Sequence, residues 1–334
     1  MRLLIAYNAP TGKPEKENPD LISEAAVQDE AKAVFDAAVK SKIEPVLLPV
    51  SDIPNLFNRV KDINPDVIFN LCEGFQGNAS HEMHIASLWE LLGIPYTGNS
   101  ALTLGLAQDK ILTKRLLEAK RIHTPPYQVF REIPEKVMLD FPLIAKPSHE
   151  DASLGIGADA VALTLKELQK KVEHLLRKYN QPILVEQYIP GREFNISLIG
   201  SPARVLAVSE IDFSALSKHE FRITSYEAKW MPDHPLYQKT PVHCPAHVSD
   251  ELKKRLEDTA SQVYALLRGR DYGRVDIRVD EYDCIYVLEF NPNPDISLDA
   301  GFSKALHAAG TAYHEFVNQM VQNALSRKKQ CESG

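Results

Sequence analysis

The feature that most constrains the fold is the segment from residue 273 to residue 294, GRVDIRVDEYDCIYVLEFNPNP. It reads as two short strands joined by a polar turn at residues 280–283, which predicts a β-hairpin. Successive side chains of a strand point to opposite faces, so Arg274, Asp276 and Arg278 share one face of the first strand. The residues between them are apolar, and the other face is therefore expected to enter a hydrophobic core.

The second strand of this hairpin carries oxygen-bearing side chains inside an apolar run. Alternation puts Glu289 and Asn291 on one face, and it puts three large side chains on the other: Tyr286, Leu288 and Phe290. A carboxylate within such a run is costly to bury unless it is paired or bound to a metal. With Asp276, these oxygens suit a hard cation such as Mg²⁺, which would in turn hold phosphate. The alternative is a half-exposed hairpin with solvated charges.

The bulk composition excludes several classes of protein. A chain of 334 residues can form two or three packed units, and its net charge of −7 argues against a general nucleic-acid binder. The start, MRLLIAYN, turns polar too soon for a signal peptide, and no apolar run reaches the length of a membrane span. The four cysteines lack CxxC spacing and are expected as free thiols in a reducing cytosol. The composition therefore predicts a cytoplasmic protein without membrane or nucleic-acid partners.

Residues 1–102 alternate between strand-like and helix-like segments, which predicts an N-terminal α/β domain with a mostly parallel, Rossmann-like sheet. The strands are expected at residues 2–7, 45–50 and 66–71. Helices are expected at residues 23–40, with Ser23 as the N-cap, and at residues 82–92. Loops at the carboxyl ends of parallel strands lie on one edge of the sheet, so loops 8–19 and 72–81 should face the same cleft.

Two α+β units are predicted after this domain, a central one over residues 103–190 and a C-terminal one over residues 191–334. The central unit is expected to contain helices at 109–119 and 165–178 and strands at 127–130, 143–146 and 183–188. The C-terminal unit is expected to contain a strand at 194–199, helices at 251–267 and 312–326, and the hairpin. It also contains a long irregular stretch, residues 214–247. Because this stretch is rich in aromatic residues, a closing lid that carries Lys229 is predicted rather than a disordered segment.

Three residues beside strands have the chemistry of a nucleotide site. Lys146 ends an apolar strand and precedes the loop SHEDASLGIG, where an ammonium group and backbone N–H groups can meet phosphate. Glu186 ends the strand ILVEQYI and Glu193 follows it, so that backbone groups could bind adenine and a carboxylate could bind ribose hydroxyls. The alternatives are an exposed strand end beside a loop and two surface carboxylates.

Five segments, in this order, resemble the ATP-grasp carboxylate–amine ligases and, within them, the D-alanine–D-alanine ligase family. They are LLGIPYTGNSALTLGLAQDKILTK, FPLIAKPSHEDASLGIG, ILVEQYIPGREF, SYEAKW and YGRVDIRVDEYDCIYVLEFNPNPD. The resembling region runs from about residue 66 to the C-terminus. The resemblance implies an ATP-grasp fold, in which the Rossmann-like domain is followed by two α+β subdomains that clasp ATP. It also implies a homodimer formed through the N-terminal unit.

The resemblance implies roles for individual residues. Lys110 and Lys146 would bind the ATP phosphates, and Lys229 would reach the γ-phosphate from the lid. The adenine would be held by one side chain and three backbone positions: Glu186, Gln187, Tyr188 and Ile189. Glu193 would hold the ribose.

The reacting groups have their own implied residues. Two Mg²⁺ ions, or Mn²⁺ in their place, would be held by Asp276, Glu289 and Asn291. Arg274 would stabilise the developing oxyanion, and Ser153 would help close the site over phosphate. The implied reaction forms an acyl phosphate from a small-molecule carboxylate and ATP, and an amine then displaces phosphate.

The substrate side departs from the family pattern. Ala25 stands at the family's ammonium-binding glutamate, with Glu24 beside it, and Asp295 stands where a glycine is usual. Asp299 lies on the same side. A carboxylate near the acceptor should repel an acceptor carboxylate and favour an amine or cationic group. A ligase for amino-acid substrates other than two D-alanines is therefore predicted.

Three alternatives remain open. The first is D-alanyl-D-alanine synthesis itself. The second is a kinase on the same fold, and the third is a nucleotide-binding regulatory protein that has lost catalysis. A descendant that only binds nucleotide need not keep the predicted metal and phosphate residues, all of which are present in this chain.

Overall fold

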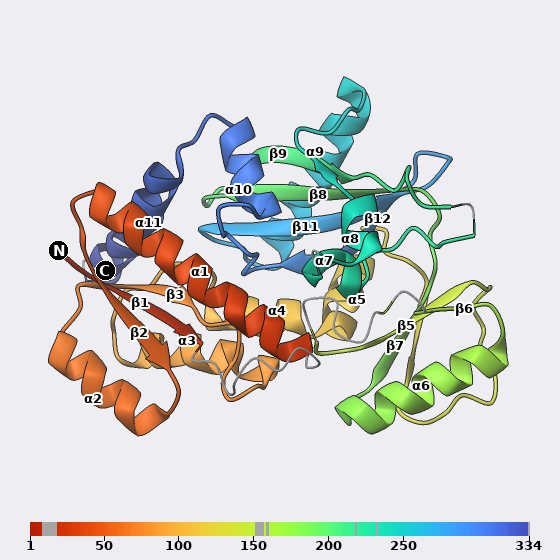
Figure 1. Ribbon diagram of the computed structural model, residues 1–334, viewed down its shortest axis with the longest axis horizontal. Helices are drawn as coiled ribbons and strands as arrows, with labels where there is room; N and C mark the ends of the chain where they lie inside the picture. The colour runs from red at the N-terminus through yellow and green to blue at the C-terminus, as the bar shows by residue number, and fades with distance from the viewer. Residues whose placement is uncertain (9–18, 151–156, 158–159, 218, 232, 333–334) are drawn as a thin grey trace.

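The computed structural model describes residues 1–8, 19–150, 157, 160–217, 219–231 and 233–332; for residues 19–26, 230 and 330–332 it describes the backbone alone. Within these residues the chain forms three sheets, with strand orders β2-β1-β3, β4-β7-β5-β6 and β10-β9-β8-β11-β12. Figure 1 shows the first sheet at the end of the molecule where both termini lie and the second at the opposite end. The predicted combination of a parallel sheet with two antiparallel α+β units is confirmed, and the predicted boundaries between the three units stay a prediction.

The first sheet is parallel and contains β1 (Arg2–Asn8), β2 (Glu44–Val50) and β3 (Val67–Leu71). Helix α1 (Pro19–Lys40) packs on one face. Helices α2 (Ile53–Ile63), α3 (Glu82–Leu91) and α4 (Ala101–Gln108) cover the other. Asn8, at the carboxyl end of β1, bonds to the backbone of Glu73 and Gly74 after β3, both at 2.7 Å. The described part of the two loops thus meets at one edge, as expected of parallel strands.

The second sheet is antiparallel and contains β4 (Tyr127–Phe130), β5 (Leu143–Pro147), β6 (Val161–Ala162) and β7 (Ile183–Gln187). Helix α6 (Leu165–Tyr179) covers it, because Leu168, Val172 and Leu175 recur at helical spacing and are buried. Thr164 caps its first turn, and it ends at a left-handed Asn180. Helix α5 (Lys110–Ala119), capped by Asp109, precedes the sheet.

The third sheet contains β8 (Arg192–Ile199), β9 (Arg204–Ile211), β10 (Val242–His243) and the predicted hairpin, β11 (Tyr272–Val279) with β12 (Ile285–Asn291). Helix α9 (Asp250–Leu266) packs on one face. Val275, Ile277 and Val279 are buried in this core, as predicted.

The predicted faces of β12 are wrong in part. Val287 and Phe290 enter the same core although they lie three positions apart. The register shifts between Asp276 and Ile277, so β12 carries one extra residue, a β-bulge at Leu288. Because of the bulge, Leu288 lines the same cavity as Glu289 instead of sharing a face with Phe290.

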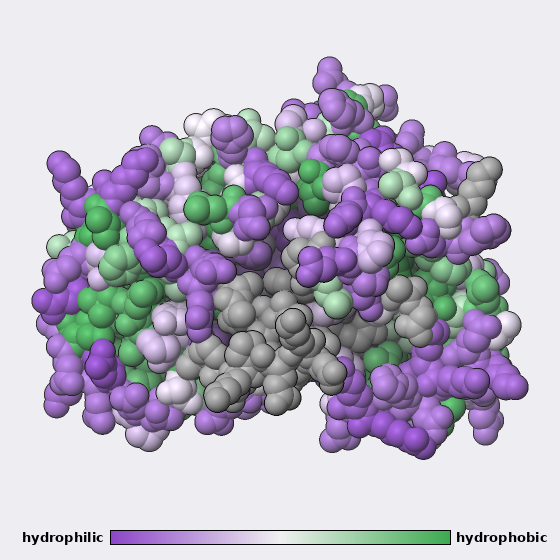
Figure 2. Space-filling view, in the orientation of Figure 1, coloured by the Kyte–Doolittle hydropathy of each residue, from purple (hydrophilic) through white to green (hydrophobic). Residues whose placement is uncertain are grey.

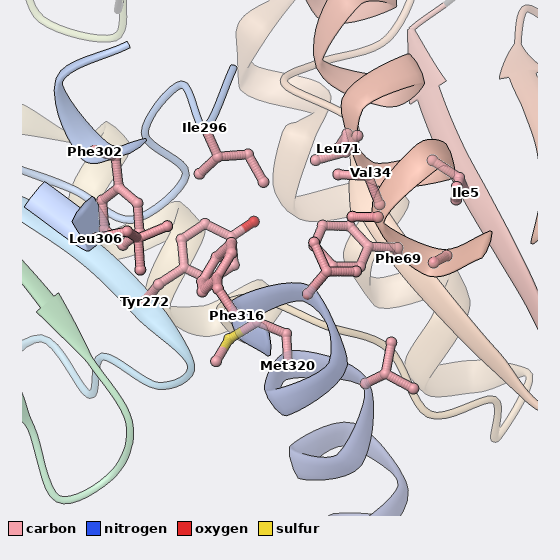
Figure 3. Packing of buried hydrophobic residues seen from close by; sticks show 14 of the residues in the cluster. Ile5, Val34, Phe69, Leu71, Tyr272, Ile296, Phe302, Leu306, Phe316 and Met320 are labelled. Atoms are coloured by element: carbon pink, nitrogen blue, oxygen red, sulfur yellow. The ribbon is translucent and has the colours of Figure 1, made fainter. Parts of the chain in front are cut away.

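The two last helices, α10 (Gly301–Ala308) and α11 (Tyr313–Glu332), connect the third sheet to the first. One buried cluster contains Phe69 of β3, Tyr272 of β11, and Phe302 and Phe316 of the two helices. The last three rings have their centroids 5.5–5.7 Å apart, and Figure 3 shows them facing Ile5, Val34 and Phe69 across the interface. Helix α11 therefore packs against the N-terminal sheet rather than only against its own unit.

Other local expectations need correction. Helix α1 begins at Pro19, so Ser23 lies inside it and is not its N-cap. The stretch 214–247 contains two short helices, α7 (Tyr226–Trp230) and α8 (Pro235–Lys239), and the short strand β10. Strand β9 and helices α2, α4 and α10 had no sequence prediction.

No helix among the described residues has the length and apolarity needed to cross a membrane. The face of the molecule in Figure 2 is mainly hydrophilic, and its hydrophobic side chains gather in separate, smaller patches.

Candidate active site

A cavity of about 1010 Å³ opens between the second and third sheets and is also lined by α7 and by the loop before α10. Most of the predicted site residues line it: Lys146, Glu186, Gln187, Tyr188, Ile189, Glu193, Lys229, Arg274, Asp276, Glu289, Asp295 and Asp299. Lys110 contacts the cavity wall through its ion pair with Glu289. Asn291 lies two residues after Glu289, at the end of β12. Ser153 and the side chain of Glu24 lie outside the described residues.

Glu186 forms a buried ion triad at the end of β7. Its carboxylate contacts the ammonium groups of Lys114 and Lys146, and the side chains of all three residues are at most 9% exposed. Burial acts to raise the pKa of Glu186, but the two lysines outweigh it and lower that pKa. Burial and Lys146 together lower the pKa of Lys114 to about 8, although Glu186 opposes them. Glu186, the carboxylate predicted on the adenine side, therefore pairs with two lysines. One of them, Lys146, is the residue predicted to bind phosphate.

Two backbone N–H groups at the end of β7 are already hydrogen-bonded within the protein. The N–H groups of Gln187 and Tyr188 donate to the carbonyls of Pro126 and Pro142, both at 2.9 Å. Ile189 lines the cavity and is the remaining candidate donor of the three predicted backbone positions. Glu193 lies just beyond, where it bonds to Arg278 and Thr224.

The opposite wall of the cavity gathers two carboxylates among cations. Asp276 and Glu289 lie opposite each other on β11 and β12. Arg274 forms a two-bond pair with Asp276 at 2.7 and 2.8 Å, and Asn195 donates to Asp276 at 2.8 Å. The ammonium group of Lys110 lies 3.4 Å from Glu289.

These cations decide the ionisation of Glu289. Burial acts to raise its pKa, but the surrounding positive charges outweigh burial and lower the pKa to about 2. They are Lys110, Lys146, Lys229 and Arg274. Burial and the charge of Arg274 in turn lower the pKa of Lys229. The site therefore offers ionised carboxylates and several cations in one enclosed space, which suits a polyanion accompanied by a metal ion.

The donor set fits Mg²⁺ or Mn²⁺. Asp276, Glu289 and Asn291 supply only oxygen ligands, and such ions are commonly held by one or two carboxylates plus substrate phosphates. Among the described residues, no three His, Cys, Asp or Glu side chains gather into a protein-only metal site. The pair of carboxylates therefore fits a metal whose coordination is completed by a phosphorylated ligand, and Asp276 would then share its oxygens between Arg274 and the metal.

One part of the cavity wall carries three carboxylates and one lysine. Asp295 and Asp299 line it together with Asp29 of α1 and Lys304 of α10. One oxygen of Asp295 accepts bonds from the backbone and hydroxyl of Ser297, at 2.8 and 2.6 Å. Buried Glu30 of α1 accepts the N–H of Ile296 at 2.8 Å, and burial, with Glu73 and Asp295, raises its pKa.

Sequence reasoning missed Lys114, Arg278, Asn195 and Glu30 as parts of this region. The i,i+4 spacing of Lys110 and Lys114 on one helix face was the available signal for Lys114. Arg278 shares a strand face with Arg274 and Asp276, so alternation also pointed to it. Nothing local marks Asn195 or Glu30, because their partners lie 81 and 266 residues away.

The chain is similar to known proteins over most of its length. Residues 103–322 match the family model for the D-ala D-ala ligase C-terminus. The chain is 34% identical over 263 residues to the uncharacterised protein y4sG of Sinorhizobium fredii, covering 78% of this chain and 75% of that one. It is 31% identical over 241 residues to the D-alanine–D-alanine ligase of Bordetella petrii, covering 70% and 69%.

The fold comparison points to the same class. The crystal structure of the D-alanine–D-alanine ligase from Bacillus anthracis complexed with ATP matches with a TM-score of 0.76 and 21% identity, over 100% of this chain and 99% of that one. The fold is thus that of the ATP-grasp enzymes. The chain belongs to the D-alanine–D-alanine ligase family, and it is an ATP-dependent ligase.

Proposed function

We propose that the protein joins a small carboxylate to an amine through an acyl phosphate, with cleavage of ATP to ADP and phosphate. The observation that carries this proposal is the group of four cations around Glu289 and Asp276 in a cavity large enough for a nucleotide and two small substrates. The distribution of charge supports one orientation of the ligands. The nucleotide would lie between β7 and β12, with its phosphates toward Glu289 and the other substrates toward Asp295.

Each wall has a role in this proposal. Ile189 N–H and Glu186 would hold adenine, with the backbone of Gln187 and Tyr188 shaping the pocket, and Glu193 would hold ribose. Lys110, Lys146 and Lys229 would neutralise the phosphates. Asp276, Glu289 and Asn291 would hold Mg²⁺, which supplies charge neutralisation for the transferring phosphoryl group.

Arg274 is placed to act on the second half of the reaction. Two of its N–H groups bond to Asp276, which fixes the guanidinium, and the remaining N–H groups can donate to an oxyanion. A buried, prealigned donor of this kind stabilises a tetrahedral oxyanion without reorganisation. Lys229 on α7 and Ser153 would cover the phosphates and exclude water from the acyl phosphate.

The three carboxylates near α10, which outnumber the one lysine there, Lys304, support an acceptor other than D-alanine. Asp295 is held by Ser297 and lines the wall beside Asp299 and Asp29. A carboxylate there disfavours the carboxylate of a second amino acid and favours an amine or a cationic group. The second candidate is D-alanyl-D-alanine synthesis, which the identity to the ligase of Bordetella petrii favours.

The test is ADP release with Mg²⁺ from a panel of amino acids and amines, singly and in pairs, followed by mass measurement of the product. An amide product that needs both a carboxylate and an amine supports the ligase. A phosphorylated product formed without an amine would support the kinase alternative instead. An Asp295→Gly variant with unchanged acceptor preference would count against the role of that carboxylate.

A further inference from the structure

A buried arginine on β11 joins three segments at the nucleotide end of the cavity. Arg278 is 3% exposed and lies directly opposite Glu193 in the register of β8 and β11. Its Nε donates to Oε2 of Glu193 at 3.0 Å, and its Nη2 lies 2.9 Å from the same oxygen. The pair is firmly held, because opening it would leave two buried charges without partners.

The same guanidinium fixes the backbone that follows β7. Its Nη1 donates to the carbonyls of Ile189 and Gly191, at 3.3 and 3.4 Å. Gly191 has a φ of +137°, and a Cβ there would lie 2.0 Å from the carbonyl oxygen of Val279. The chain therefore passes against β11 at a distance that only glycine permits.

The third segment is the approach to α7. The carbonyl of Arg222 accepts from Nη2 of Arg278, and the hydroxyl of Thr224 donates to Oε1 of Glu193 at 2.7 Å. The N–H of Arg222 also donates to the hydroxyl of Tyr188 at 3.3 Å. Helix α7 begins two residues after Thr224 and carries Lys229. Aromatic rings of Tyr188 and Phe213 lie 5.6 and 5.4 Å from the guanidinium carbon and complete its enclosure.

We propose that Arg278 is a positioning residue that couples ribose recognition by Glu193 to the placement of Lys229. This inference rests on the proposed function, in which Glu193 receives the ribose hydroxyls. Arg278 and Thr224 hold Glu193 from two sides. Arg278 is bonded to the segment that leads into α7, and Thr224 belongs to that segment. A ribose that donates to Glu193 therefore meets an oriented carboxylate. Because the attached segment orients Glu193 for ribose, ribose binding in return favours the attached arrangement of that segment.

The test compares equilibrium binding of ADP and 2′,3′-dideoxy-ADP with Mg²⁺, which needs no knowledge of the other substrates. The wild-type protein should prefer ADP by about 10-fold or more, because hydrogen bonds to an oriented carboxylate are strong. In Arg278→Met this preference should fall below about 3-fold, and Arg278→Lys should restore part of it. Hydrogen exchange of residues 221–231 should slow on ADP binding in the wild type and much less in Arg278→Met.

Arg192→Met is the matched control. Arg192 lies on the neighbouring strand β8, pairs with Glu210 at 2.7 Å and does not line the cavity. It should keep the wild-type preference. Should Arg278→Met fail to fold, Thr224→Val removes one bond to Glu193 without removing a charge and should lower both the preference and the protection.

The outcomes separate the two proposals. An undiminished preference for ADP in folded Arg278→Met, or in Thr224→Val, would overturn the coupling and leave the proposed function intact. Absence of ADP binding to the wild-type protein would overturn the proposed function itself.

Discussion

At the scale of single residues, Glu289 carries the strongest electrostatic signature of the site. Its pKa of about 2 means that it stays ionised at any pH at which the protein would be assayed. We predict that Glu289→Gln lowers ADP release by more than about 100-fold and raises the Mg²⁺ concentration needed for half-maximal rate, because the charge of a proposed metal ligand is lost.

The measurement for Glu289 is ADP release against Mg²⁺ concentration. Glu281→Gln, on the exposed turn of the same hairpin, is the matched control and should behave as wild type. An unaltered Mg²⁺ requirement in Glu289→Gln would remove this residue from the proposed metal site.

Lys114 gives the site a pH dependence. Its pKa is lowered from 10.5 to about 8, chiefly by burial, so it loses its charge within an accessible range. Above pH 8 Lys146 alone would neutralise Glu186. The net positive potential at the proposed phosphate position would therefore fall. We predict that the Kd for ADP rises about 5- to 10-fold between pH 7.5 and 9.5 in the wild type.

The same shift affects stability with a defined sign. The unfolded chain binds this proton up to about pH 10.5 and the folded protein up to about pH 8, so the free energy of unfolding rises with pH between these values.

The variant that tests the pH dependence of ADP binding is Lys114→Met. It should bind ADP weakly and without the change near pH 8. An equal change in wild type and variant would show that another group titrates.

At the scale of elements, α7 depends on its first turn. It has only five residues, and the hydroxyl of Ser225 accepts the N–H of Ala228 at 3.3 Å. A helix this short has little stability of its own. We predict that Ser225→Ala lowers kcat for ADP release about 3- to 30-fold, since a lost cap costs about 0.5–2 kcal/mol and this helix positions Lys229.

Ser249→Ala is the comparison for this change. Ser249 caps α9, which packs on the third sheet and contributes no residue to the cavity wall. It should lower the free energy of unfolding by about 1 kcal/mol and leave kcat unchanged. Equal kinetic effects of the two substitutions would contradict a specific role for the cap of α7.

At the scale of the whole molecule, Asp271 connects the loop before α4 with the last helix, α11. It is 2% exposed and accepts bonds from the N–H of Gly98 at 2.8 Å and from Arg327 of α11 at 2.6 and 2.9 Å. Its φ of 59° is tolerated by asparagine, so Asp271→Asn removes the charge without straining the backbone. We predict a loss of about 1.5–3 kcal/mol in the free energy of unfolding, measured in urea.

Asp258→Asn is the control at this scale. Asp258 pairs with Lys254 at 3.1 Å on the exposed face of α9, and such pairs contribute little. Its loss should change stability by no more than about 0.5 kcal/mol. A similarly small effect of Asp271→Asn would mean that Asp271 contributes little to holding the N-terminal sheet to the third sheet.

Local periodicity accounts for what could be predicted. The parallel strands, helix α6, helix α9 and the hairpin each carry their pattern within a few residues, because burial of one face imposes a period of two or 3.6. Alternation on the hairpin placed Asp276 near Glu289, whereas several other site residues, among them Lys110 and Arg274, were predicted from the resemblance to the ligase family. Strand β9 and helices α2, α4 and α10 went unpredicted, and so did the bulge at Leu288, which breaks the alternation.

The sequence by itself determined the parallel strands, the hairpin and the chemical types of the site, because those follow from neighbours along the chain. Only the tertiary structure decided that Glu186 is shared by two lysines, that Arg278 joins Glu193 to the segment before α7, and that α11 packs on the N-terminal sheet. Each of those depends on groups that are distant in sequence. Burial forces the charges to find partners in space, and the apolar face of α11 is buried against the apolar face of the N-terminal sheet.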